Sequence, residues 1–356
     1  MAAQRRPPRG VVAVRKVIPT RPAGNPERTA NLAVARNAVR SVCFTSQGGI
    51  IEQRPTRSTV GGRAYLDLRK RAKADRRITA EYLKLYALEG FLLRLAQSEH
   101  RPRFVLKGGV LLAAYQLRRP TADIDFAAVQ TTNDIESVRQ DIIAIAGTGL
   151  PAHLDDGLIF DLEEVTAQGI RDQDQRGGIR VRLAAELATA REQFHVDVNI
   201  GDAIWPPQQK SSSPPARSGT ISLRGYPMEM ALAEKIITAL QLGIASTRWR
   251  DFGDIYQLTG QYHLNAQTVH EAFQAVATYR SAEPTALADE LGGYAQLAQS
   301  RWFAWRSRHD LADRLPDNFE DVLDAVTAFA DPVLTTNLAS EWDPATRAWT
   351  HTVDAS

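Results

Sequence analysis

Cysteine is nearly absent from this sequence, since Cys43 is the single one among 356 residues. One thiol cannot build an internal disulfide framework or a cysteine-rich zinc site, which argues against redox chemistry and zinc-finger folds. Long apolar runs are also lacking, because no stretch approaches the roughly 20 residues that a membrane-spanning helix needs. The apolar stretch after the basic N-terminus is too short for a signal peptide, so we expect a cytoplasmic protein with no membrane partner.

A large net charge is missing too: it is +2, with a pI of about 8.7, and such totals alone do not indicate a nucleic-acid partner. The distribution is more informative, because the charges before Thr79 are mostly positive and the last forty residues lean acidic. We predict that 1–75 is a basic, largely flexible arm with at most short helical pieces. The arm either contacts RNA or merely solubilises the protein, and a misassigned upstream start site is a further alternative.

The length predicts more than one domain, because single hydrophobic cores usually stop growing before it is reached. A hydrophobic share of 44% and a charged share of 24% are those of an ordinary soluble protein. Pro and Ser residues between 206 and 215 indicate a loop or domain boundary. The predicted parts are the arm at 1–75, an α/β (α+β) core with a mixed sheet at 76–224, a mainly helical C-terminal domain at 225–332 and a tail at 333–356.

The first motif is a strand, a glycine turn and a helix. An apolar strand at 104–106 ends in Lys107-Gly108-Gly109, and a helix is predicted from 110 to 117. The next strand begins with Asp123-Ile124-Asp125-Phe126, whose alternation places both aspartates on one face. Glycine lets backbone N–H groups approach a phosphate at the N-terminus of a helix, whose dipole favours anions.

The second motif is a strand at 194–200, which presents His195, Asp197 and Asn199 on its polar face. The other predicted elements are a helix at 135–145, strands at 158–165, 179–183 and 221–223, and helices from there to about 330. A nucleoside triphosphate binds together with Mg²⁺, which neutralises its negative charge, and Mg²⁺ takes carboxylate oxygens as ligands. We therefore expect Asp123, Asp125 and Asp197 to share a site, with one of them bridging two ions if a third carboxylate lies opposite.

Each of these signals is weak alone, because most Asp-x-Asp pairs and Gly-Gly turns have no catalytic function. Their order and separation are what predict a metal-dependent nucleotidyltransferase. His195 shares the polar face with Asp197 and either orients a group near the site or is a structural histidine. Thr121 either hydrogen-bonds a phosphate or is simply a turn residue.

Two stretches together resemble a known family: Phe104-Val-Leu-Lys-Gly-Gly109 and Arg119-Pro-Thr-Ala-Asp-Ile-Asp-Phe126. They look like the AbiEii/AbiGii-type toxin nucleotidyltransferases, including the mycobacterial Men-type toxins, within the polymerase-β-like superfamily. The resemblance covers about 78 to 260 and extends to Glu229-Met-Ala-Leu-Ala-Glu-Lys235-Ile-Ile and Arg248-Trp-Arg-Asp251-Phe-Gly-Asp254-Ile. One departure is Val110, where many relatives carry Ser or Thr. That change removes a phosphate hydrogen bond and shifts triphosphate binding toward the backbone and Lys107.

The resemblance implies a polymerase-β-like core and roles for residues of the helical half. Lys235 is expected to contact the triphosphate, and Asp251, or less favourably Asp254, to be the acid beside it. Surface salt bridges at Lys235, Arg248, Arg250 and Asp251 are the alternative.

The resemblance also implies an acceptor and a partner. The acceptor would be the 3′ end of tRNA, so that nucleotide addition blocks translation, and the partner would be a cognate antitoxin protein. Arg180 and Arg182, on one face of a strand, are candidate phosphate contacts. Two rival functions stay open: a small-molecule nucleotidyltransferase of the aminoglycoside-modifying kind, and a catalytically silent protein that binds RNA or a protein partner.

Overall fold

The fold is mixed α/β, as predicted, and a computed structural model of the chain gives its details. The structure describes residues 11–15, 54–115, 117, 121–129, 131–171, 177–206, 220–336 and 338–351. The predictions for 1–10 and 16–53 of the arm, and for Cys43, lie outside the described residues. No helix in the described ranges is both long and apolar enough to cross a membrane.

A mixed sheet of five described strands organises the first half of the molecule. In spatial order the strands are β2 (Phe104–Lys107), β3 (Asp123–Ala128), β6 (Ala190–Ile200), β5 (Gly177–Leu187) and β4 (Ile159–Arg171). β3 and β6 run parallel, and the other neighbours are antiparallel. β2 is buried along its whole length, while β3 turns its two aspartates to the partly exposed face and buries Ile124 and Phe126. This alternation separates the core from the candidate site.

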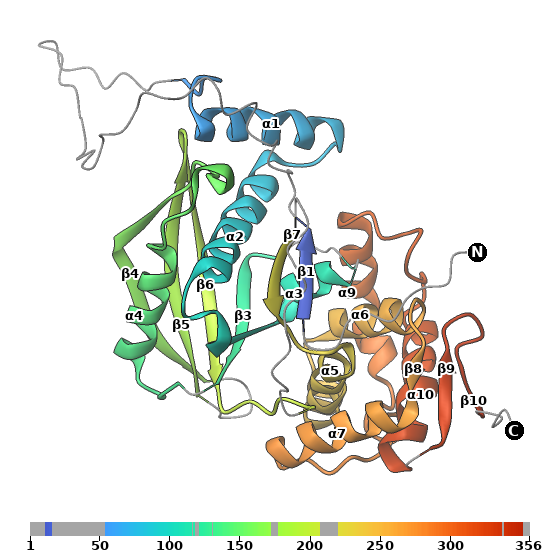
Figure 1. Cartoon of the computed structure of the whole chain (residues 1–356). Helices are drawn as coiled ribbons and strands as arrows, with labels where there is room; N and C mark the ends of the chain where they lie inside the picture. Colours follow the sequence, from blue (N-terminus) through green and yellow to red (C-terminus); the bar gives the residue numbers. More distant parts are fainter. Residues whose placement is uncertain are drawn as a thin grey trace, which may run out of the picture.

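Helices flank the sheet and lead into a mainly helical second half (Figure 1). The first four are α1 (Val60–Ala74), α2 (Thr79–Gln97), α3 (Gly108–Ala114) and α4 (Ile135–Ala146). The later ones are α5 (Met228–Leu242), α6 (Trp249–Thr259), α7 (Ala266–Arg280), α8 (Leu287–Glu290), α9 (Tyr294–Arg308) and α10 (Phe319–Thr335). α2 packs on β6 and α4 on β4, so both helices cover the same side of the sheet.

The predicted core strands are present but longer than the sequence suggested. β4 reaches Arg171, because a register shift between Asp161 and Thr166 lets the strand continue past a local irregularity. β6 begins at Ala190 and continues directly from β5 through a tight turn, with Leu187 opposite Ala190. Polar residues at these strand ends interrupt the apolar alternation, and the sequence pattern therefore predicted shorter strands.

The prediction that 1–75 holds at most short helical pieces was wrong for the part that the structure describes. α1 has 15 residues, and the hydroxyl of its N-cap Thr59 accepts a hydrogen bond from the backbone of Gly62. β1 (Val11–Arg15) pairs antiparallel with β7 (Thr220–Arg224), about 200 residues later. Such a distant partner leaves no local signal in the sequence.

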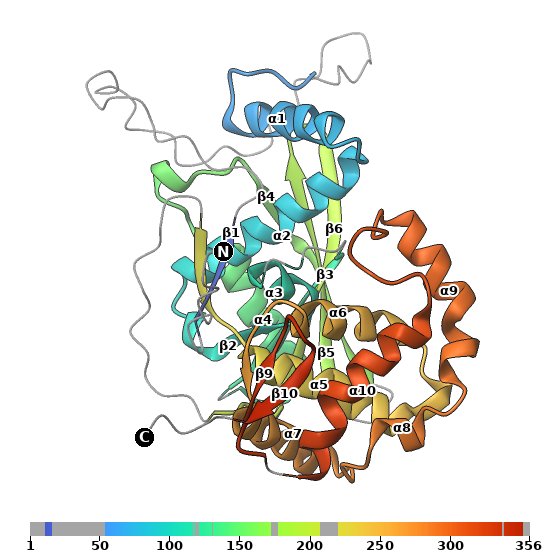
Figure 2. The ribbon, with the colours of Figure 1, turned by 90° about the vertical axis from the view of Figure 1, so that its right-hand side faces the viewer.

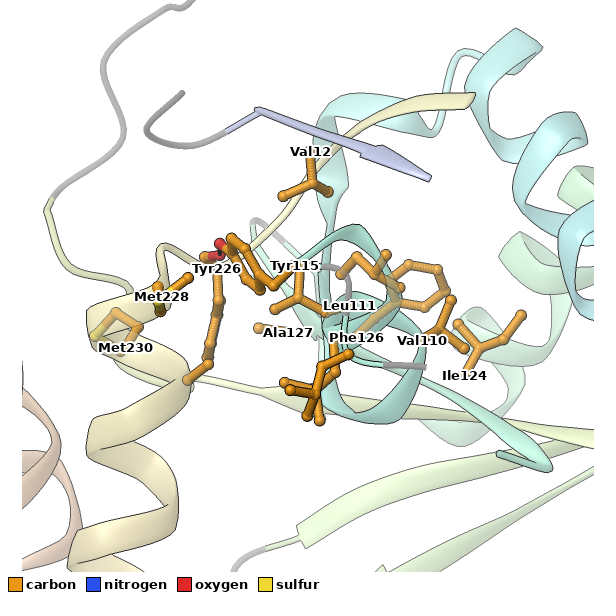
Figure 3. Close-up of a cluster of buried hydrophobic side chains, with 14 of the residues drawn as sticks. Val12, Val110, Leu111, Tyr115, Ile124, Phe126, Ala127, Tyr226, Met228 and Met230 are labelled. Carbon is orange, nitrogen blue, oxygen red and sulfur yellow. Dashed lines mark hydrogen bonds between the residues drawn. The ribbon is translucent and has the colours of Figure 1, made fainter. Parts of the chain in front are cut away.

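β1 also contributes to the core. Val12 points toward a cluster that includes Leu111, Tyr115 and Tyr226 (Figure 3). Val12 and Val14 are 5% and 2% exposed. Burial of two such side chains contributes roughly 3 kcal/mol or more relative to leaving them in water. The strand is therefore part of the folded core rather than an appendage.

The described part of the predicted tail, 333–336 and 338–351, is packed against the helical half. β9 (Ser340–Asp343) pairs with both β10 (Ala348–His351) and β8 (Leu264–Asn265). Trp342 is fully buried, and its indole N–H donates to the carbonyl of Thr259 at the end of α6, at 2.7 Å. Arg347 donates to the carbonyl of Tyr256 one turn earlier. Figure 2 shows the hairpin of β9 and β10 beside α10.

Candidate active site

The predicted site residues line one cavity of about 720 Å³, between the sheet and the helical half. They come from four regions: the turn after β2, β3 with the residues before it, β6, and helices α5 and α6. The predicted residues that line the cavity are Lys107, Gly108, Gly109, Thr121, Asp123, Asp125, Asp197, Lys235 and Asp251. The volume falls within the range typical of small-molecule sites. His195, Asp254 and Val110 do not line it.

The strand register brings the three aspartates to one wall of the cavity. Parallel pairing sets Asp125 directly opposite Asp197 and Asp123 opposite His195. Asp123 and Asp125 lie on the same face of β3 because they are two residues apart. The hydroxyl of Thr121 donates to Asp123 Oδ1 at 3.1 Å, which orients this carboxylate without neutralising it.

Asp125 lies between two other site residues in the sheet, opposite Lys107 of β2 on one side and Asp197 of β6 on the other. Burial and then the negative charge of Asp123 raise the pKa of Asp125, Lys107 opposes them, and the net pKa is about 7. Gly108 makes the close packing possible, because a Cβ at this position would lie 1.8 Å from Asp125 Oδ2. Its positive φ of 65° also favours glycine. The result is a crowded set of carboxylates that a cation would relieve.

Arg180 supplies part of the positive charge that these carboxylates need. Its Nε donates to Asp197 Oδ1 at 2.8 Å, and its terminal nitrogen donates to Asp197 Oδ2 at 2.6 Å. These hydrogen bonds are the first cause of its raised pKa, to which the charges of Asp197, Asp123 and Asp125 add. Sequence analysis suggested Arg180 only as a phosphate contact, alongside Arg182. The register sets Arg182 opposite His195, where its side chain is exposed.

Lys107 lies in the cavity wall but is bound by acids. Its ammonium donates to Glu234 at 3.0 Å and to Asp202, and it lies 5.7 Å from the centroid of the Tyr226 ring. Burial lowers the pKa of Lys107, but Glu234 and Asp202 more than offset this, and the net pKa is raised. Burial also raises the pKa of Glu234. Lys107 therefore joins β2 to α5 through its ion pair with Glu234. The sequence did not predict Glu234 or Asp202 as its partners.

Lys235, the next residue along α5, faces α6. Its ammonium donates to Asp251 at 2.5 Å and to Asp254 at 2.9 Å. Asp251 lines the cavity, whereas Asp254 is 1% exposed and does not. This favours Asp251 over Asp254 as the acid that faces a ligand, with Asp254 supporting the lysine from behind.

Three arginines add positive charge to the wall formed by the helical half. They are Arg248 and Arg250, at the start of α6, and Arg280, at the end of α7. Arg248 and Arg250 were expected mainly as surface residues, and Arg280 was not predicted at the site. No local pattern marks Arg280, because only the packing of α7 against α5 brings it to the cavity. The cavity therefore has an acidic wall on the sheet and a predominantly basic wall on the helices.

The acidic wall offers the right donor chemistry for Mg²⁺, which prefers carboxylate oxygens. Within the described ranges, no group of three or more His, Cys, Asp or Glu side chains has the geometry to hold a metal ion. The pairing of Asp197 with Arg180 accounts for this at the aspartates: Asp123 and Asp125 face the cavity, but the third carboxylate is bound to a guanidinium. A shared site would need Asp197 to exchange Arg180 for the cation.

Comparison with known proteins gives a family match. The family model described as "Nucleotidyl transferase AbiEii toxin, Type IV TA system" matches residues 90–327, which include every predicted site residue. Among curated proteins, none matches the sequence.

Two solved structures from Helicobacter pylori are distantly similar. One, assigned as a nucleotidyltransferase, is 17% identical with a TM-score of 0.37, covering 70% of this chain and 92% of that one. The other, JHP933, is also 17% identical with a TM-score of 0.38, covering 72% of this chain and 92% of that one. Similarity at this level says nothing about the substrate of this chain.

Proposed function

This chain belongs to the AbiEii nucleotidyltransferase toxin family, and from that membership we propose a specific reaction. It is the Mg²⁺-dependent transfer of a nucleotide from a nucleoside triphosphate to the 3′ end of tRNA, which blocks translation. The observation that carries the proposal is the pair of opposed walls in one cavity, with Asp123 and Asp125 facing a wall that includes Lys235. Carboxylates that hold a cation and basic groups that hold phosphates are what this transfer requires.

The basic wall binds the triphosphate. Lys235, Arg248, Arg250 and Arg280 offset its negative charge, and Asp251 keeps the Lys235 ammonium directed at the cavity. The backbone N–H groups of Gly108 and Gly109, at the start of α3, approach the phosphates where no Cβ intervenes. Lys107 acts from within the wall, since its charge is already matched by Glu234 and Asp202.

The acidic wall performs the transfer. Asp123 and Asp125 would hold Mg²⁺, and Asp197 would complete the site after releasing Arg180. The bound cation would polarise the α-phosphate and lower the pKa of the attacking hydroxyl. The hydroxyl oxygen attacks the α-phosphorus in line, its proton passes to Asp197, and the bond to pyrophosphate breaks. Arg180, freed from Asp197, remains beside the acids to balance charge on the transferred group.

The cellular setting follows from the same proposal. A family described as the toxin of a type IV toxin–antitoxin system implies a cognate antitoxin protein as partner. A tRNA acceptor places the reaction in the cytoplasm. The basic residues before Thr79 would assist tRNA binding through its phosphates.

Transfer of labelled nucleotide to total tRNA tests the function. Wild-type protein with Mg²⁺ should label tRNA, and Asp125→Ala should reduce labelling by about a hundredfold or more. Asp313→Ala, an exposed change in the helical half outside the cavity, is the matched control and should label normally. Circular dichroism should show that both variants remain folded. Full activity of Asp125→Ala would overturn the assignment, and label found only in small molecules would favour the rival enzyme.

A further inference from the structure

A second cavity, of about 430 Å³, lies on the other side of α3 and has no role in the reaction above. Its walls are largely apolar. Tyr82, Leu85 and Leu88 line it from α2, while Val110 and Ala113 line it from α3. Phosphate would not be held by such walls, whereas a flat, mainly apolar group would be.

Three residues line both cavities: Gly109, Thr121 and Ala122. Gly109 and Thr121 are in close contact, because a Cβ at Gly109 would lie 2.8 Å from Thr121 Oγ1, whereas Ala122 is exposed beside them. Thr121 also donates to Asp123 in the acidic wall. A molecule that enters the second cavity is therefore one side chain away from the proposed reaction centre.

The second cavity also has polar groups among its lining residues. Lys84 and Glu192 form an ion pair at 3.1 Å, Arg77 and Glu81 form another at 2.9 Å, and Glu89 contributes a further carboxylate. Apolar walls with a few charged or hydrogen-bonding groups suit a heteroaromatic ring, which stacks through its faces and pairs through its edge.

We propose that the second cavity binds the terminal nucleobase of the RNA acceptor. The ribose of the same nucleotide would then lie across the exposed Ala122, which lines both cavities, and bring its 3′-hydroxyl to Asp123 and Asp125. The triphosphate occupies the first cavity, so donor and acceptor enter from different sides of α3. This inference rests on the proposed function and adds a site for the acceptor that is separate from the donor site.

Filling the cavity tests the inference by kinetics. Ala113→Leu adds a side chain at a partly exposed position that lines only the second cavity and keeps a good helix former in α3. It should raise the KM for the RNA acceptor about tenfold, because stacking of one base is lost, and leave the KM for the nucleoside triphosphate unchanged. Ala144→Leu, at an exposed position of α4 that lines neither cavity, is the control.

A modified acceptor gives a second measurement that needs no variant. RNA whose 3′-terminal nucleotide lacks its base keeps the reacting hydroxyl, and it should be about tenfold poorer for wild-type protein. Ala113→Leu should no longer distinguish the two acceptors. Equal use of both acceptors by wild-type protein, or a raised KM for the triphosphate in Ala113→Leu, would overturn the inference while leaving the proposed function standing. If wild-type protein labels no RNA at all, the proposed function itself fails.

Discussion

At the scale of single residues, the pKa of Asp125 shows that the site lowers the stability of the folded state. Its folded-state pKa of about 7 lies above the ordinary value of 3.8 for an aspartate. Between these values the folded state holds a proton that the unfolded chain has lost, so stability falls as pH rises from about 4 through 7. Three pKa units correspond to roughly 4 kcal/mol at most. An active-site carboxylate is thus retained at the expense of stability.

Asp125→Asn should remove this pH-dependent penalty. We expect the variant to be more stable than wild type at pH 8 by roughly 2 to 4 kcal/mol without metal, and close to wild type at pH 4. Denaturant unfolding at the two pH values measures this. Asp313→Asn, an exposed change in the helical half, is the control and should not alter the pH dependence. An unchanged decline in stability between pH 4 and pH 8 in Asp125→Asn would refute the effect.

Arg180 should compete with Mg²⁺ for Asp197. Because its guanidinium occupies both oxygens of that carboxylate, Arg180→Ala should lower the Mg²⁺ concentration that gives half-maximal thermal stabilisation, by about fivefold or more. Titration of melting temperature with Mg²⁺ measures this. Arg182→Ala, two residues along the same strand, should titrate like wild type. Weaker stabilisation of Arg180→Ala by Mg²⁺ would show that the arginine supports the site instead.

At the scale of elements, β1 makes a sharp prediction. Val14→Asp places a carboxylate where the native side chain is 2% exposed and should destabilise the protein by about 3 kcal/mol or more. The neighbouring Ala13 is exposed, so Ala13→Asp should change stability by less than about 0.5 kcal/mol. Thermal or denaturant unfolding of the two variants measures the difference. Equal effects would mean that β1 does not pack as described.

Elements with a local signal could be predicted from the sequence, and those that depend on distant partners could not. The alternation in β3 and β6 and the glycine turn after β2 are local, and they gave the core strands and the candidate acids. The pairing of β1 with β7 and the contact of Lys107 with Glu234 join residues more than 100 positions apart. For the same reason Lys107 was predicted as a phosphate ligand and was found among acids.

At the scale of the whole molecule, the distribution of charge predicts how tRNA binds. α1 exposes Arg69, Lys70 and Lys73 on its surface. If these contact tRNA phosphates, affinity should fall steeply with added salt, and reversing all three to Glu should lower the slope by about 2 to 3. Filter binding at several salt concentrations measures the slope. Reversing Arg301, Arg308 and Arg314 in the helical half is the control, and an equal slope in both variants would remove α1 from the interface.

The C-terminal hairpin holds the far end of a helix that reaches the cavity. β9 pairs with β8, and Trp342 and Arg347 bind the last turn of α6, the helix whose first turn carries Asp251 into the cavity. The residues that line the cavity all lie before position 281, so the hairpin steadies the site without touching it. Loosening the hairpin would therefore let α6 shift and displace Asp251, although no residue of the cavity itself had been altered.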